Sequence, residues 1–353
     1  MIQNALGPQK PFDLFTEFAK FASMHQISLR DPKATLAFTN YVGESVDRAR
    51  SDPIRLHGQR AQAMFEAMLV SLGGYHLLKV EDTGRVYPAD RFKVPDFRVV
   101  LTDRTQWLIE VKNVYIADSN NQRRRLMRRA YLEKLKSYAA CTGGLLKVAV
   151  YWAQWGFWTL VSPERLVDVD GNLTLDMHTA LAVNELGRLG DQMIGTRPPL
   201  RLRLTVDPAR TSSVGPDGKV EVTIARAQIY CGEDEVLDPV EEQIAWLLMR
   251  YGEWKESQPE LLMDGDRPKT IELQWEPKVQ ENNGFEIVGS LSQIFTRYYA
   301  EQTVEDREVV QTLAPPRPKW FEPLVRSEYE RKALPLWQFI LQPNFAILGE
   351  KGI

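Results

Sequence analysis

The sequence predicts an α/β fold in which helices flank a central sheet of mixed direction. Three observations support this fold class: an apolar helix precedes a β-hairpin, a long basic helix follows the hairpin, and two apolar strands come after that helix. This order lacks the regular alternation of a doubly wound fold. In chain order, the predicted elements cover residues 58–74, 75–81, 94–101, 106–115, 121–140, 145–153 and 156–163.

The chain is long enough for more than this sheet. Its 353 residues are 44% hydrophobic and 26% charged, an ordinary globular composition that allows two domains or one enlarged domain. We expect an N-terminal helical region over residues 1–54, a sheet-containing core over 55–168, and an α+β C-terminal region over 169–353.

Local signals justify the elements before the basic helix. Residues 11–50 carry apolar side chains at helical spacing, and residues 51–57 are expected to connect them to the next helix. The helix over 58–74 is rich in alanine, methionine and leucine and stops at two glycines. The hairpin strands alternate apolar and polar residues on either side of a polar "TDRT" turn.

The C-terminal region shows weaker but readable signals. Two paired strands are expected around a Gly-Pro-Asp-Gly-Lys turn, followed by a helix that starts at an Asp-Pro pair. A further strand, a further helix and a proline-rich connector complete the region. These elements cover residues 201–207, 219–230, 238–254, 270–276, 285–302 and 313–320.

Charge is distributed unevenly along the chain. Residues 55–165 contain 18 Lys and Arg against 10 Asp and Glu, a net charge of +8, so the rest of this chain of net charge −3 carries −11. A basic segment within an acidic chain is typical of a polyanion-binding module with acidic attachments. The two cysteines are too few for a disulfide framework, and no apolar run is long enough to span a membrane, so we expect a cytoplasmic protein with reduced thiols.

The hairpin carries charged residues where apolar ones would pack better. If its apolar residues face the core, then Asp96, Glu110 and Lys112 gather on the opposite face. Directly opposite residues of an antiparallel pair point the same way. Asp96 therefore lies opposite Glu110 or Lys112 and not opposite Val111, which requires an odd-numbered loop or a bulge near residues 103–105.

Two carboxylates and an amine at short range have a chemical use. Oxygen ligands suit Mg²⁺, and we expect Asp96, Glu110 and the carbonyl of Val111 to hold Mg²⁺ or Mn²⁺. Lys112 would then orient the attacking water or stabilise charge on phosphate. This interpretation makes the site one for phosphodiester hydrolysis.

These residues resemble a known family. The pattern Pro95-Asp96 followed by Glu110-Val111-Lys112 is similar to the PD-(D/E)xK signature of restriction-endonuclease-like nucleases, and the segment is also loosely similar to Tn7-type transposon-end endonucleases. The resemblance covers residues 58–162. It implies a restriction-endonuclease-like core, DNA as the substrate and a 5′-phosphate product. It also implies a further acidic ligand on the preceding helix, where Glu66 is the one acidic residue.

The helix after the hairpin is expected to contact DNA. In some branches of the family it carries a Gln-x-x-x-Tyr element near the substrate, and Lys134 and Tyr138 occupy that place here. Basic side chains contact phosphates without reading sequence. The predicted nucleic-acid-binding residues are Arg123, Arg124, Arg125, Arg128, Arg129, Lys134 and Tyr138.

The sequence therefore predicts a Mg²⁺- or Mn²⁺-dependent deoxyribonuclease, an endonuclease of a mobile-element, restriction or anti-phage system, with Glu66, Asp96, Glu110 and Lys112 as catalytic residues. The alternative is a nuclease-fold subunit that binds DNA or protein and cleaves only within a larger complex, or not at all. For the acidic C-terminal region we expect a protein partner or a homodimer contact.

Overall fold

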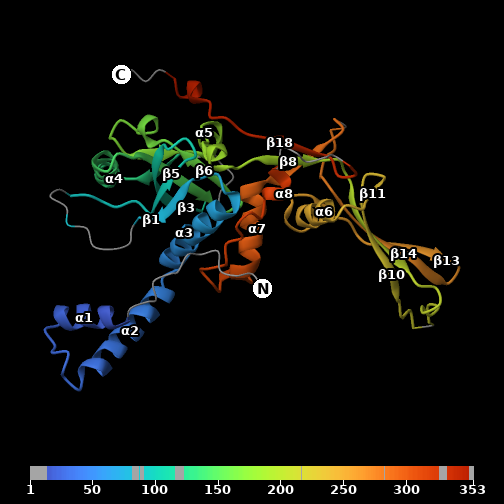
Figure 1. Ribbon diagram of the computed structural model, residues 1–353, viewed down its shortest axis with the longest axis horizontal. Coiled ribbons are helices and arrows are strands. Elements are labelled where there is room, and N and C mark those ends of the chain that lie inside the picture. Colours follow the sequence, from blue (N-terminus) through green and yellow to red (C-terminus); the bar gives the residue numbers. More distant parts are fainter. Residues whose placement is uncertain are drawn as a thin grey trace.

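The computed structural model of the chain describes residues 14–81, 87, 91–115, 123–215, 217–281, 283–325 and 332–349. Figure 1 shows a central body from which a helical hairpin and a ribbon of β-strands extend in different directions. Within the described ranges, none of the helices combines the length and the apolar character needed to cross a bilayer.

The projecting hairpin consists of α1 (Leu14–Met24) and α2 (Ala34–Arg50), so the described part of the N-terminal region is helical as predicted. Its two helices meet through aromatic rings, with the centroids of Phe18 and Phe38 5.5 Å apart. The next helix, α3 (Pro53–Leu72), begins five residues earlier than predicted. The reason is local: the Asp52 side chain accepts hydrogen bonds from two backbone N–H groups of the first turn, and proline fits that turn.

The first sheet has five strands in the order β1-β2-β3-β5-β6. The β3 and β5 strands run parallel, whereas the other neighbouring pairs are antiparallel, which confirms the predicted mixed direction. The strands are β1 (Leu77–Val80), β2 (Phe97–Val100), β3 (Gln106–Val114), β5 (Leu145–Trp152) and β6 (Phe157–Val161).

Each face of this sheet is covered by different helices. On one face, α3 packs against β3, which carries Trp107 and Ile109, and α7 (Leu291–Thr303) packs against β6. On the other face, α4 (Arg129–Cys141) packs against β5 and α5 (Met177–Ala182) against β6, and the buried residues there include Leu108, Val148 and Val150. Alternation along β3 therefore assigns odd-numbered residues to the α3 side and even-numbered residues to the α4 side.

The predicted helix over 121–140 is shorter than expected. Residues 121 and 122 lie outside the described residues, and Arg124–Met127 form a strand, β4, that pairs with β7 (Leu173–Leu175). Met127 is buried in the core on the α4 face. A run of cationic side chains opposes the dipole at a helix N-terminus, and pairing with β7 supplies the backbone hydrogen bonds instead.

The C-terminal region contains α-helices and β-strands, as predicted. One correction concerns residues 285–302, whose first part forms β15 before α7 begins. The β9, β10 and β14 strands build the extended ribbon seen in Figure 1. The remaining elements are β8 (Met193–Thr196), β9 (Leu200–Val206), β10 (Ile224–Cys231), β11 (Asp234–Val236), α6 (Pro239–Tyr251), β12 (Lys255–Glu256), β13 (Glu260–Asp264), β14 (Arg267–Glu276), β15 (Glu286–Ser290), β16 (Val304–Glu305), β17 (Glu308–Val309), α8 (Glu322–Val325) and β18 (Leu336–Phe339).

The hydrophobic core continues across the predicted boundary at residue 168. One cluster of buried residues runs from α3 and the first sheet to α6 and α7, and it includes Phe65, Trp107, Ile244 and Phe295. The β7 strand and α5 lie beyond residue 168 but pack on the first sheet. The C-terminal region therefore contributes elements that pack on the first sheet.

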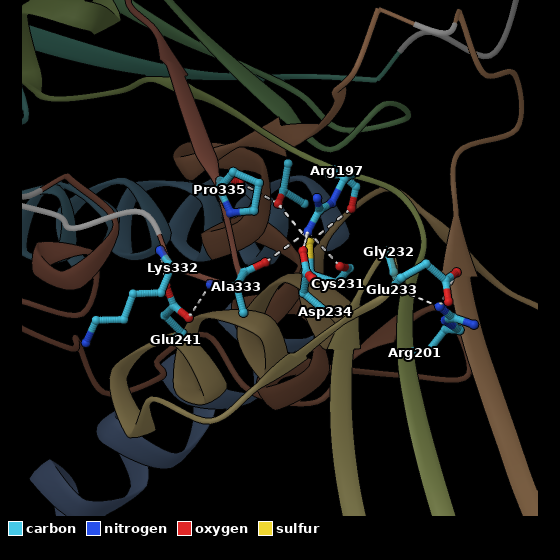
Figure 2. A network of polar contacts seen from close by, with 11 residues as sticks. Arg197, Arg201, Cys231, Gly232, Glu233, Asp234, Glu241, Lys332, Ala333 and Pro335 are labelled. Atoms are coloured by element: carbon cyan, nitrogen blue, oxygen red, sulfur yellow. Dashed lines mark hydrogen bonds and ion pairs between the residues drawn. The ribbon is translucent and has the colours of Figure 1, made fainter.

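Figure 2 shows how the last described segment is attached. The buried carboxylate of Glu241 accepts hydrogen bonds from the backbone N–H groups of Lys332, at 3.1 Å, and Ala333, at 3.2 Å. The hydroxyl of Thr196 donates to the carbonyl of Pro335 at 2.7 Å. These bonds place β18 alongside β8, where it completes a three-stranded sheet.

Candidate active site

The β2–β3 hairpin places Asp96, Glu110 and Lys112 on the same face of the sheet. Phe97 pairs with Ile109 and Val100 pairs with Gln106, so five residues form the loop and the same register, continued, sets Asp96 opposite Glu110. The parity inference from the sequence is thus confirmed. The loop turns through Arg104, which has a positive φ of 70°.

Asp96 is fixed to the backbone of the neighbouring strand. Its Oδ2 accepts a hydrogen bond of 2.7 Å from the N–H of Val111, one peptide away from Glu110. Its carbonyl accepts a 2.8 Å bond from the N–H of Glu81. The Asp96 carboxylate is therefore held against the backbone of β3 at the residue that follows Glu110.

Glu110 is only 3% exposed, and its two oxygens have different environments. Oε1 accepts a 2.6 Å hydrogen bond from the Tyr131 hydroxyl and a 2.5 Å ion-paired bond from Lys112 Nζ. The ammonium of Lys112 also lies 4.9 Å from the centre of the Tyr131 ring. Oε2 is buried and has no hydrogen-bond partner among the described residues.

Glu66 lies elsewhere, which corrects one predicted member of the site. Glu66 lies on α3, which packs on one face of the first sheet through Met64, Phe65 and Met68. Asp96 and Glu110 lie on the opposite face of that sheet, which α4 covers. Glu66 instead lines a cavity of about 320 Å³, together with Ala63, Ala67, Val70 and residues 313–316. Burial there raises the pKa of Glu66. Helical periodicity explains the error: Phe65 points at the sheet, so its neighbour is turned about 100° away.

A second glutamate, which sequence reasoning missed, lies beside the site. Glu81 accepts hydrogen bonds from Arg98 at 2.8 Å, from the Tyr138 hydroxyl at 2.7 Å and from Lys79 at 3.1 Å. The Arg98 guanidinium is the main reason that the pKa of Glu81 falls from its ordinary value of 4.5 to about 2. The sequence signal was the strand 75–81, whose last residue is acidic.

Tyr131 is the other residue that sequence reasoning did not assign to the site. It lies on α4, and its hydroxyl reaches Glu110. A usable signal was its spacing from Tyr138, because residues seven apart lie on the same face of a helix.

The basic residues of the predicted DNA-binding set spread over two elements. Arg123, Arg125, Arg128, Arg129 and Lys134 are exposed, and Arg124 is half-buried in β4. Arg128 and Arg129 stand at the start of α4, two or three residues before Tyr131. The hydroxyl of Tyr138 is bound to Glu81, so the structure does not present it to a ligand as predicted.

The donor set fits a divalent cation held by few protein ligands. Within the described ranges, no group of three His, Cys, Asp or Glu side chains could hold a metal ion by itself. A buried carboxylate oxygen without a donor is costly, however, and a cation would satisfy it. Mg²⁺ binds through one or two carboxylates, with water and phosphate completing its shell, so Glu110 and Asp96 are the residues that could hold it.

Comparisons with known proteins add little to this geometry. No family model matches the chain, and no curated protein matches it. One solved structure is similar in part: Archaeoglobus fulgidus Hjc, a Holliday junction resolvase from an archaeal hyperthermophile. The alignment covers 33% of this chain and 88% of the Hjc chain, with 22% sequence identity and a TM-score of 0.26. Similarity at this level carries no argument about activity, so the function must be argued from the residues themselves.

Proposed function

We propose that the chain is a divalent-metal-dependent nuclease that hydrolyses DNA phosphodiester bonds, with Mg²⁺ or Mn²⁺ as the ion. The observation that carries the proposal is the asymmetry of Glu110, the residue that the continued strand register sets opposite Asp96: one oxygen is held by Tyr131 and Lys112, and the other is buried without a donor among the described residues. The large majority of buried polar side-chain atoms have a hydrogen-bond partner, so a carboxylate oxygen without one needs an explanation.

The roles of the residues follow from their positions. Glu110 Oε2 and the Asp96 carboxylate would hold the ion, and the Val111 carbonyl is available from the same strand. When bound, such an ion would lower the pKa of a bound water and neutralise charge on phosphate. Lys112 keeps its ammonium within 2.5 Å of Glu110, where it would hold a phosphate oxygen or the attacking water.

DNA is the substrate that the surroundings of the site support. Arg128 and Arg129 are exposed at the start of α4, and Arg123 and Arg125 are exposed on or just before β4, which pairs with β7. Arginine and lysine side chains contact the phosphate backbone and supply affinity that does not depend on sequence. Tyr138 is left out of this set because Glu81 holds its hydroxyl.

A second candidate is a subunit that cleaves only within a larger complex. The specific observation behind it is that Lys112 and Glu110 are paired with each other at 2.5 Å. In this candidate, the pairing would hold the Lys112 ammonium on Glu110 until substrate or another protein draws it away. The acidic C-terminal region is the natural place for that protein to bind.

Plasmid cleavage tests the proposal. Supercoiled plasmid is incubated with Mg²⁺ or Mn²⁺ and the wild-type protein, Asp96→Ala or Lys112→Ala, with Asp103→Ala as a control from the same hairpin. We expect nicked or linear plasmid from wild type and the control, and none from the two site variants or in the presence of EDTA. Cleavage that persists in both site variants would refute the assignment. DNA binding without cleavage in every case would favour the second candidate.

A further inference from the structure

The α4 helix presents two tyrosines to two glutamates of the sheet. Tyr131 and Tyr138 are seven residues apart, so their side chains leave the same face of the helix. Each donates its hydroxyl to a buried glutamate, Tyr131 to Glu110 at 2.6 Å and Tyr138 to Glu81 at 2.7 Å. The chain thus contains an internal matched pair of contacts.

The two contacts differ in whether the second oxygen of the glutamate also has a donor. At Glu81, cations from the strands complete the coordination of the carboxylate, and Tyr138 adds one more donor. At Glu110, both donors converge on Oε1, and the second oxygen has no partner in the described part of the chain. Tyr131 therefore helps to define which oxygen is held and which remains available.

We propose that Tyr131 is a positioning residue for the metal site, an inference that rests on the proposed function. Its hydroxyl and Lys112 together hold Oε1 of Glu110 and so fix the orientation of the carboxylate, which would leave Oε2 available to bind a cation. Without the hydroxyl, Lys112 alone holds Oε1, and Lys112 is also the residue that must engage substrate. Tyr131 keeps Glu110 oriented when the ammonium of Lys112 moves to phosphate.

The ring of Tyr131 contributes separately from its hydroxyl. Lys112 Nζ lies 4.9 Å from the ring centroid, within the range of a cation–π contact. Tyr131→Phe removes the hydrogen bond and keeps this contact, whereas Tyr131→Leu removes both. Comparing the two variants separates the orientation of Glu110 from the placement of Lys112.

The test measures Mn²⁺ binding by calorimetry on the full chain without DNA, and plasmid nicking in parallel. We expect Tyr131→Phe to weaken Mn²⁺ affinity about 10-fold, in the range seen when partners of metal ligands are removed. The nicking rate should fall at low Mn²⁺ and recover as Mn²⁺ is raised. Tyr138→Phe, which removes the same group from the same helix, should leave Mn²⁺ affinity and nicking within about twofold of wild type.

Thermal unfolding in EDTA separates positioning from folding. Both phenylalanine variants lose a hydrogen bond to a charged group, so both should be somewhat less stable. Equal Mn²⁺ affinity in Tyr131→Phe and Tyr138→Phe, with wild-type nicking intact, overturns the role of Tyr131 and leaves the nuclease assignment standing. Mn²⁺ binding that weakens only in Tyr131→Phe, in a chain that never cleaves DNA, supports the role of Tyr131 and overturns the nuclease assignment. A wild-type chain that binds no Mn²⁺ overturns both.

Discussion

The surroundings of Glu110 and of Glu81 form two centres under one helix. Both glutamates lie at or in strands of the same sheet, both are at least nine-tenths buried, and both accept a tyrosine hydroxyl from α4. Both also pair with strand cations. By burial and by residue type the two centres are nearly equivalent.

The difference between them lies in how fully each carboxylate is satisfied. Glu81 receives donors on both oxygens, and its pKa drops to about 2, which marks a carboxylate stabilised as the anion. Glu110 keeps one buried oxygen without a donor among the described residues. Burial and charge are thus shared by the two centres, and the oxygen without a donor is what distinguishes Glu110 from Glu81.

The largest expected effect is a difference in plasmid cleavage rate between variants of the two glutamates. Glu110→Gln should slow plasmid cleavage on the order of 100-fold or more, the scale on which losing one preorganised electrostatic group slows catalysis. Glu81→Gln should cleave at close to the wild-type rate. Initial nicking rates at saturating Mg²⁺ check this, and comparable losses in the two variants would contradict the comparison.

For the free energy of unfolding we expect the opposite ranking of the two glutamates, with Glu81 the more important. Glu81→Gln removes a charge-assisted network and should cost about 2 kcal/mol in the free energy of unfolding at neutral pH. Because the pKa of Glu81 is lower when folded than when unfolded, its contribution is present above about pH 4.5 and is lost as the pH falls toward 2. Urea unfolding from pH 7 to pH 3 should show the difference between variant and wild type shrinking. A difference independent of pH contradicts the ionic origin.

Divalent ions should stabilise one centre and not the other. At ten times its dissociation constant, a bound ion adds about 1.4 kcal/mol to the free energy of unfolding. We expect Mn²⁺ to raise the melting temperature of wild type and of Glu81→Gln, but not of Glu110→Gln. Differential scanning fluorimetry with and without EDTA measures it. An equal rise in all three proteins would place the ion somewhere else.

The smallest expected effect concerns the arginines near Tyr131. Replacing both Arg128 and Arg129 with alanine should weaken DNA binding a few-fold and reduce the slope of log affinity against log salt by about 2, one for each lost phosphate contact. Lys136→Ala, near the Glu81 end of α4, serves as the control. Fluorescence anisotropy on one duplex at several salt concentrations checks both, and identical slopes would place the DNA elsewhere.

The hairpin and the order of the first elements could be predicted because their signals are local. Alternation along the strands around Asp96, Glu110 and Lys112 fixes which side chains share a face, and parity then dictates the loop. The mixed sheet and most helices follow from periodicity and from stop signals such as Gly73, whereas the Asp52 cap that starts α3 was overlooked.

The tertiary structure decided the features that depend on distant partners. Pairing with β7 converted Arg124–Met127 from helix into strand, and the contact of α3 with the sheet and α7 turned Glu66 toward residues 313–316. The rotation of a helix about its axis is set by what packs against it, and a spacing pattern does not specify its partner. For the same reason, only the packed α4 shows that Tyr131 reaches Glu110 and that Tyr138 reaches Glu81.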